Sequence, residues 1–341
     1  MKRTILVGIA TAALAAVTLA AQGLQINGAG ATFPAPLYTK WFAEYNKLHA
    51  DVRVNYQPVG SGAGIQQMIK KTVFFGASDA PMTPEQLQSA PGRILHFPTV
   101  LGAVVPVYNV PGVAQELKFT GDLLSNIFLT KITKWNDPQI AKLNPGVNLP
   151  AADITVVHRS DGSGTTYIWC DFLAKVSPEY KKTVGVATSV KWPANTIGGK
   201  GNEGVAGLVS QTPGAIGYVE LIYALQTKIA YGAVQNSSGK FVKATPESVT
   251  AAASAAAAQM PADFRVSITN PPGDAAYPAS SFTWLLLYED PPDKKQGKAV
   301  VDFVKWALTD GQKFAPDLGY APLPKSVVDL ELKALARIKV Q

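Results

Sequence analysis

Apolar positions along the chain follow two different spacings, each typical of one kind of secondary structure. Short, β-branched apolar segments predict buried strands at Val52–Tyr56, Phe74–Ala77, Val104–Val110, Ile154–Val157, Ala215–Val219, Arg265–Thr269 and Phe282–Tyr288. Apolar residues three or four positions apart predict helices at Leu37–His49, Ile65–Lys71, Thr165–Val176, Glu203–Gln211 and Lys298–Leu308. Strands that alternate with helices predict an α/β fold with mixed, mostly parallel sheets flanked by helices.

An alanine-rich stretch, Ala251–Ala258, follows Pro246 and Glu247. Its helix propensity and the proline near its first turn predict a solvent-side helix. Because nothing chemical projects from alanine, we expect this helix to be structural.

The first residues have the pattern of an export signal. Lys2 and Arg3 precede an uncharged apolar stretch, Ile5–Ala20, which is short for a transmembrane span and is followed by small residues. We therefore predict a signal peptide over residues 1–22, cleaved near residues 20–23. A retained signal anchor is the alternative, but no stop-transfer cluster of charges follows Gln22.

The single cysteine narrows the possible compartments. Cys170 lies far from the predicted cleavage point, so it cannot carry a lipid there, and it has no partner for an internal disulfide. Its apolar surroundings predict a small buried residue. An exported protein without an anchor is best retained behind an outer membrane, so we expect it in the periplasm.

About 320 residues remain after cleavage, which is long for one hydrophobic core. No Gly/Ser-rich or Pro-rich linker separates two consecutive halves, so we predict discontinuous lobes. If the chain crosses near Thr99–Ala103 and returns near Tyr277–Phe282, residues 23–102 and 277–341 form lobe I, and residues 103–276 form lobe II. A hinge between such lobes would allow closure around a ligand.

The net charge restricts the choice of ligand only weakly. The formal charge falls from +7 to +5 on cleavage, because residues 1–22 contain Lys2 and Arg3 and no acidic residue. This surplus helps to attract anions, but the basic residues are dispersed, so we predict no nucleic-acid partner.

Three polar, glycine-containing segments each precede a predicted helix: Gly28-Ala-Gly-Ala-Thr-Phe-Pro, Gly60-Ser-Gly-Ala-Gly and Asp161-Gly-Ser-Gly-Thr-Thr. The first turn of a helix has unpaired N–H groups and a partial positive charge, so it can bind an anion. Taken singly, each segment is better explained by an ordinary helix cap, at Thr32, Ser61 or Ser163. Three of them at strand ends of an α/β fold favour converging anion sites.

Two charged residues stand at the start of the third segment. Arg159 follows a predicted strand and could place two donors on an oxyanion, while Asp161 would hold the guanidinium in position. A surface ion pair of little energetic weight is the alternative, and the spacing alone does not separate the two.

Asp79, in Phe75-Gly-Ala-Ser-Asp-Ala-Pro, follows another predicted strand. A carboxylate beside an anion site is useful if the ligand still carries a proton, because the ionised group only accepts hydrogen bonds. Phosphate keeps a proton near neutral pH whereas sulfate has none, and two buried acceptors facing each other are costly. Asp79 therefore favours phosphate over sulfate.

Signatures of enzymes and metal sites are missing from the sequence. The segment Ile197–Gly201 lacks the Ser or Thr of a phosphate-binding loop, and His49, His96 and His158 have no zinc spacing and offer no evident base for Ser163. We predict no catalytic residue, metal or cofactor. An exported phosphate-ester hydrolase and a purely structural surface protein remain as weaker alternatives.

Five motifs occur in order along the chain: Gly28-Ala-Gly-Ala-Thr-Phe-Pro-Ala-Pro, Phe75-Gly-Ala-Ser-Asp-Ala-Pro, Arg159-Ser-Asp-Gly-Ser-Gly-Thr, Gly198-Gly-Lys-Gly-Asn and Pro213-Gly-Ala-Ile-Gly-Tyr-Val-Glu. Together they resemble the phosphate-binding proteins of phosphate-specific ABC transporters, from about Gly28 to Val327. The resemblance implies a two-lobed periplasmic-binding-protein fold of type II-like form. It also implies a monomer that passes inorganic phosphate to permease subunits in the inner membrane. A carrier for another tetrahedral oxyanion, such as sulfate, is the alternative within this class.

The resemblance also implies a set of contacts to a dehydrated phosphate, at Thr32, Phe33, Ser61, Asp79, Arg159, Ser163, Gly164 and Thr165. Phe33 would contribute its backbone N–H, Asp79 would accept the phosphate proton, and Asp161 would orient Arg159. Small departures from the family pattern, such as Gly62, leave these donors in place.

Overall fold

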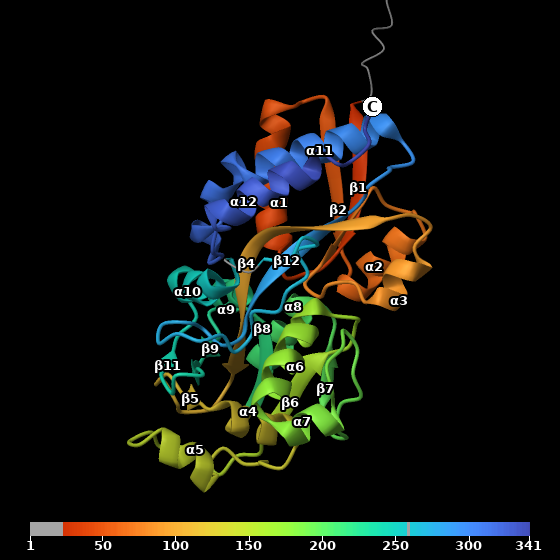
Figure 1. The fold of residues 1–341 in the computed structure, drawn as a ribbon. Coiled ribbons are helices and arrows are strands. Elements are labelled where there is room, and N and C mark those ends of the chain that lie inside the picture. Colours follow the sequence, from red (N-terminus) through yellow and green to blue (C-terminus); the bar gives the residue numbers. More distant parts are fainter. Residues whose placement is uncertain (1–22, 258–259) are drawn as a thin grey trace, which may run out of the picture.

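The computed structural model describes residues 23–257 and 260–341 (Figure 1). The predicted signal peptide and Ala258, the end of the alanine-rich stretch, lie outside the described residues. Within the described ranges, no helix combines the length and the apolar character needed to cross a membrane.

The strands form one long mixed sheet and one small sheet. Their bounds are β1 Leu24–Gly30, β2 Val52–Pro58, β3 Phe75–Ser78, β4 Ile94–Tyr108, β5 Lys118–Phe119, β6 Thr155–Arg159, β7 Ile197–Gly199, β8 Ala215–Glu220, β9 Ala230–Tyr231, β10 Ala233–Gln235, β11 Phe241–Val242 and β12 Ser280–Tyr288. The long sheet has the order β2-β1-β3-β12-β4-β8-β6-β7, with β9 also paired to β4, and the small sheet has the order β11-β10-β5.

The strand β4 joins the two parts of the long sheet. Residues 94–103 pair with β12, whereas residues 104–108 pair with β8. The register shifts opposite Thr99, between Thr283 and Trp284, which marks a β-bulge in the predicted crossing region. The two-lobed architecture is therefore built on one strand that contributes to both lobes, while the exact lobe boundaries remain a prediction.

Strand directions differ between the junction and the outer parts of the sheet. β1 pairs parallel with β2 and β3, and β6 pairs parallel with β7 and β8. β4 and β12 pair antiparallel with each other and with their neighbours. The parallel strands β1 and β3 end at the same edge, so the polar segments that follow them lie together.

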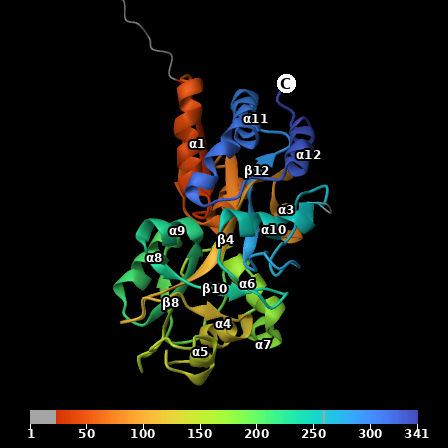
Figure 2. The same cartoon turned by 90° about the vertical axis from the view of Figure 1, so that its left-hand side faces the viewer.

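Helices cover both parts of the sheet. Their bounds are α1 Ala35–Leu48, α2 Ser61–Ile69, α3 Pro84–Ser89, α4 Gly121–Phe128, α5 Pro138–Leu143, α6 Gly164–Val176, α7 Pro178–Thr183, α8 Gly201–Gln211, α9 Leu221–Thr227, α10 Pro246–Ala257, α11 Lys294–Leu308 and α12 Lys325–Leu335, with short 3₁₀ turns at Asp310–Phe314 and Pro316–Leu318. Both views place α1, α11 and α12 at one end of the molecule and α4, α5 and α7 at the other, with β4 running between (Figures 1 and 2).

The predicted strand at Arg265–Thr269 is wrong. This segment has no strand partner; instead the Nη1 of Arg265 donates to the carbonyl of Met82 at 2.9 Å, and the Nζ of Lys175 donates to the carbonyl of Thr269 at 3.1 Å. Alternating β-branched residues favour extended backbone, but only a neighbouring strand converts extended backbone into sheet.

The alanine-rich helix α10 is less exposed than the sequence predicted. It packs on β4 and β12, and Val249, Ala252 and Ala253 are buried. Small side chains allow this close approach, so alanine here serves packing as well as helix propensity.

Candidate anion-binding site

The three glycine-containing segments meet where the two lobes touch. The N–H of Gly62, in the first turn of α2, donates to the carbonyl of Gly162 at 2.9 Å. The N–H of Gly164, the first residue of α6, donates to the Oγ of Ser61 at 3.0 Å. The starts of α2 and α6 thus face each other, and the partial positive charges of both helices are directed at one place.

Thr32 and Phe33 connect β1 to α1 and are held by tyrosines. The Tyr223 hydroxyl donates to the carbonyl of Thr32 at 2.6 Å, and the Tyr320 hydroxyl donates to the carbonyl of Phe33 at 2.6 Å. The cap interpretation of Thr32 is wrong, because α1 is preceded by Pro34 and has no side-chain cap. Within the described residues the N–H of Phe33 has no acceptor, so it is free to serve as a donor.

Ser61 links three segments instead of capping its helix, so the cap interpretation is wrong here too. It is the first residue of α2, and Gly60 occupies the N-cap position. The Oγ of Ser61 accepts from the N–H of Asp79 at 3.2 Å and lies 3.4 Å from the Oδ2 of that residue. Gly60 has φ 96°, and a Cβ there would lie 2.3 Å from the Oδ2 of Asp161. Only glycine allows this approach.

Asp79 lies immediately after β3 and is buried, with 1% of its surface exposed. Its Oδ1 accepts from the Oγ1 of Thr283 at 2.8 Å. Burial raises the pKa of Asp79 to about 7, although hydrogen bonds from Thr283 and Ser61 and the charge of Arg159 oppose the rise. Near neutral pH this carboxyl can therefore hold or release a proton, which suits it to share one with a bound anion.

Arg159, the last residue of β6, forms a buried, two-pronged ion pair with Asp161. Its Nε donates to Oδ1 at 2.8 Å and its Nη2 to Oδ2 at 2.5 Å. The Arg159 side chain is only 1% exposed and that of Asp161 13%, so the alternative of a surface pair is wrong. Burial raises the pKa of Asp161, but the hydrogen bonds and charge of Arg159 outweigh it and leave the pKa below its usual value.

The start of α6 supplies the opposite wall. Ser163 is the N-cap, and its Oγ accepts from the N–H of Thr166 at 3.0 Å. Thr165 accepts on Oγ1 from the Nη1 of Arg159 at 3.2 Å. A Cβ on Gly164 would lie 2.5 Å from the Oγ of Ser61, so the close contact requires glycine.

Two residues of this network were not predicted as site residues. The Nδ2 of Asn202 donates to the Oγ1 of Thr32 at 2.8 Å and to the Oγ1 of Thr165 at 3.1 Å, which ties hydroxyls of the first and third segments together. Asn202 closes the Gly198-Gly-Lys-Gly-Asn motif, so the motif was a usable signal. Thr283, the donor to Asp79, lies inside an apolar strand, and no sequence motif marked it as a site residue.

Among the described residues, no histidine ring bonds to a side chain of this network, although the Nδ1 of His158 lies 2.9 Å from the carbonyl oxygen of Arg159. His158 stacks on Trp192 with ring centroids 4.9 Å apart, and burial lowers its pKa. His96 is buried and accepts from the N–H of Met82, and His49 stacks on Tyr45. Cys170 is fully buried, as predicted. Around Ser163 the described residues therefore supply donors for an anion and no imidazole base.

A two-lobed α/β fold with a buried cluster of polar groups between its lobes is typical of a solute-binding protein, and the chain matches the PBP superfamily domain over residues 15–310. It is 48% identical over 328 residues to "Phosphate-binding protein PstS" of Pasteurella multocida, covering 96% of this chain and 93% of the relative. It is 47% identical over 308 residues to the protein of the same name in Xylella fastidiosa, covering 90% and 84%. The chain belongs to this family of phosphate-binding proteins.

A solved structure extends the comparison to the fold. The periplasmic phosphate-binding protein PfluDING, solved with bound phosphate, superimposes with a TM-score of 0.73 at 22% identity, covering 91% of this chain and 93% of the other. At this identity the likeness concerns the fold alone.

Proposed function

We propose that this protein binds one inorganic phosphate ion between its lobes and delivers it to an ABC transporter for import. One observation carries the proposal: a buried carboxyl with a pKa near 7, Asp79, faces a region otherwise rich in donors, beside the paired guanidinium of Arg159. Such a site accepts an anion and one proton together. Phosphate brings both, whereas sulfate binds only after Asp79 has taken up a proton itself, and the site gives no means of hydrolysing an ester.

We assign the phosphate contacts to the hydroxyls of Thr32, Ser61, Ser163 and Thr165, to the N–H groups of Phe33 and Gly164, and to the side chains of Asp79 and Arg159. Asp161 orients the guanidinium. Two sets of direct bonds support the assignment: one joins Arg159 to Thr165, and the other joins Ser61 to both Asp79 and Gly164.

The cellular part of the proposal rests on the sequence. Residues 1–22 are the export signal, residues 23–102 and 277–341 form lobe I, and residues 103–276 form lobe II. The mature chain is a periplasmic monomer that meets permease subunits at the inner membrane. Mass spectrometry of the exported protein would check the cleavage site.

Calorimetric titration of the mature, phosphate-free protein tests the ligand. We expect tight 1:1 binding of phosphate. At pH 8.5, where Asp79 is ionised, we expect binding of sulfate to be weaker by at least about thirtyfold, because its oxygens then meet an acceptor. Arsenate, which also carries a proton, should compete with phosphate. Equal affinity for sulfate and phosphate would contradict the proposal, and turnover of a chromogenic phosphate ester would favour the hydrolase.

A further inference from the structure

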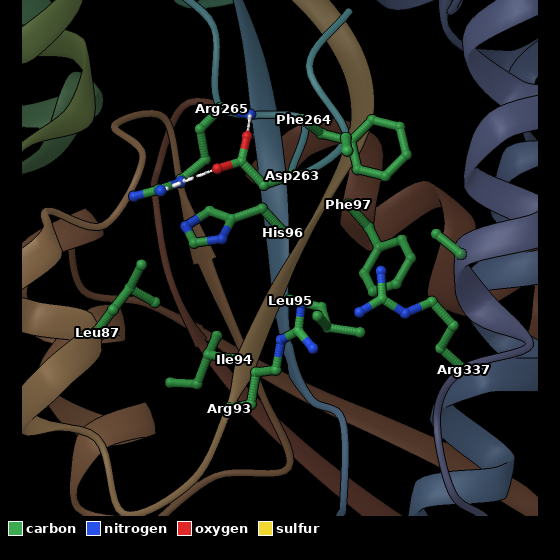
Figure 3. A pocket seen from close by; sticks show the side chains of 12 residues that line it. Leu87, Arg93, Ile94, Leu95, His96, Phe97, Asp263, Phe264, Arg265 and Arg337 are labelled. Atoms are coloured by element: carbon green, nitrogen blue, oxygen red, sulfur yellow. Dashed lines mark hydrogen bonds and ion pairs between the residues drawn. The ribbon is translucent and has the colours of Figure 1, made fainter.

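A cavity of about 260 Å³ lies between the first half of β4, the segment 262–265 and the end of α12, and none of the proposed phosphate contacts lines it (Figure 3). Its apolar lining includes Ile94, Phe97 and Phe264, each at most 5% exposed. The rings of Phe97 and Phe264 lie 6.4 Å apart and are buried beneath the cavity, while the half-buried Leu87, Leu95 and Ala334 supply the accessible part of its apolar lining.

Arginine side chains surround this apolar lining. Arg93 and Arg337 approach from different walls (Figure 3), and both pair with the same oxygen of Glu289, at 3.4 Å and 3.1 Å. Arg265 pairs with Asp263 at 2.9 Å. These guanidiniums outnumber the two carboxylates by one, and each has five N–H donors. The cavity therefore keeps an excess positive charge and unused donors for a single negative charge.

His96 adds a neutral donor to the wall. The ring is 4% exposed, and its Nε2 accepts from the N–H of Met82 at 3.0 Å. A neutral ring that accepts at Nε2 must carry its proton on Nδ1, and this N–H has no acceptor within the described residues. Burial and the charge of Arg265 lower the pKa of His96 to about 3, so the ring stays neutral at physiological pH.

We propose that this cavity is a binding site for a small organic monocarboxylate with an apolar, preferably aromatic, body. The carboxylate would lie between Arg93 and Arg337, and the body would pack on the apolar lining that Leu87, Leu95 and Ala334 expose. The volume lies just below the roughly 300–1,000 Å³ of sites for drug-sized ligands, so it suits a molecule of about the size of benzoate. An inorganic oxyanion would leave the apolar lining unused.

The cavity is also connected to the phosphate site. Two of its residues hold Met82 by the backbone: His96 accepts from its N–H, and Arg265 donates to its carbonyl at 2.9 Å. Met82 stands three residues after Asp79. A carboxylate that draws Arg265 or His96 toward itself alters the support of the loop that carries Asp79. The two ligands should therefore change each other's affinity by the same factor.

Benzoate is a suitable probe, and benzamide is its neutral match. The titration is followed by NMR on the mature protein saturated with phosphate, so that the phosphate site is already filled. We expect saturable benzoate shifts on β4 and segment 262–265, with benzamide at least roughly fivefold weaker. Arg337→Gln and Arg93→Gln should each weaken benzoate roughly fivefold, whereas Arg53→Gln, a distant exposed arginine, should not.

Each of three outcomes would overturn the site. These are the absence of a saturable benzoate shift, equal affinities for benzamide and benzoate, and benzoate affinities of Arg93→Gln and Arg337→Gln that both equal that of the unmodified protein. Both variants remove partly exposed side chains, and unchanged melting temperatures would show that they remain folded. A phosphate Kd measured with and without benzoate tests the connection separately. We expect a change of roughly twofold to fivefold, and an identical Kd would overturn the connection.

Discussion

Asp79 is buried and lies near the guanidinium of Arg159, and these two features set the pKa of its carboxyl group. Its pKa of about 7 in the absence of ligand lies near that of phosphate itself. The site can therefore place a single proton on either partner, whereas sulfate brings none. The preference of the site for phosphate over sulfate should therefore depend on pH.

We predict that sulfate binding weakens as pH rises. Above about pH 7 the free Asp79 is ionised, so it must take up a proton before it can donate to sulfate, and the Kd should rise up to about tenfold per pH unit. Phosphate supplies its own proton and should lose less affinity. Calorimetry between pH 6 and 8.5 measures both values.

Asp79→Asn is the matching variant, because its amide donates at every pH. It should make the sulfate Kd independent of pH and reduce the preference for phosphate, while Asp51→Asn, an exposed carboxylate, should leave both unchanged. A sulfate Kd of the unmodified protein that does not vary with pH would exclude this role for Asp79.

Arg159 should act on every oxyanion alike. Its loss leaves Asp161 buried without its partner, so Arg159→Ala should weaken phosphate, arsenate and sulfate each by about 30-fold to 1,000-fold. Arg159→Lys should recover part of this, since the charge remains but the two-pronged geometry does not. If Arg159→Ala and Asp79→Asn lowered only phosphate affinity, and in equal proportion, their roles would not differ as proposed.

At the scale of elements, periodicity predicted the long helices better than the strands. The helices α1, α2, α6, α8 and α11 lie within a few residues of their predicted positions. β1 was missed because Leu24–Gly30 is polar and glycine-rich, yet Gly28 packs under Phe75, where a Cβ would be 2.0 Å from the ring. The strand β1 is held by close packing of its glycines against neighbouring side chains, so its sequence lacks the run of apolar residues by which a strand is predicted.

The helix α12 contains a carboxyl group with an unusual environment. Glu331 lies between Val327 and Leu335 on the buried face and is 0% exposed. Neither carboxyl oxygen has a hydrogen-bond partner within the described residues. Burial alone raises the pKa of Glu331 well above its usual value, so the folded chain keeps this proton to a higher pH than the unfolded chain does.

We predict that this group makes stability fall as pH rises. Above about pH 4.5 the unfolded chain loses the Glu331 proton while the folded chain keeps it, so unfolding releases a proton until the folded pKa is reached. Glu331→Gln should reduce the pH slope, and Glu331→Met should also raise the free energy of unfolding by about 1 to 3 kcal/mol at neutral pH. Urea unfolding without phosphate at pH 5 and pH 8 measures this. An unchanged slope in Glu331→Gln would contradict the assignment.

At the scale of the whole molecule, glycines let the two lobes approach each other closely at one point. Gly60 in one predicted lobe faces Asp161 in the other, and Gly62 faces Gly162. Substitution at Gly60 should therefore oppose closure around a ligand. The glycines at the start of α2 therefore serve two purposes: they leave the N–H groups of the helix accessible, and they allow the lobes to approach each other.

Gly60→Ala should weaken phosphate binding by at least about tenfold, because its Cβ would collide with Asp161. Gly112→Ala is the matched control: Gly112 also has positive φ, 76°, but nothing lies within 4 Å of its added Cβ. It should carry a similar backbone cost and leave the Kd unchanged. Titration, with small-angle scattering to detect closure, distinguishes the two, and equal loss in both variants would point to backbone strain alone.

The sequence by itself determined what is local: the spacing of the long helices, the glycine-containing segments that begin α2 and α6, and the acceptor chemistry of Asp79. These depend on neighbouring residues and on the groups that a side chain carries. The tertiary structure decided which of them meet. The donor to Asp79, Thr283, is 204 residues away, and Asn202 joins Thr32 to Thr165 across the lobes. Burial, and with it the raised pKa of Asp79, also arises only when the sheet brings distant strands together, because desolvation depends on what surrounds a group in space.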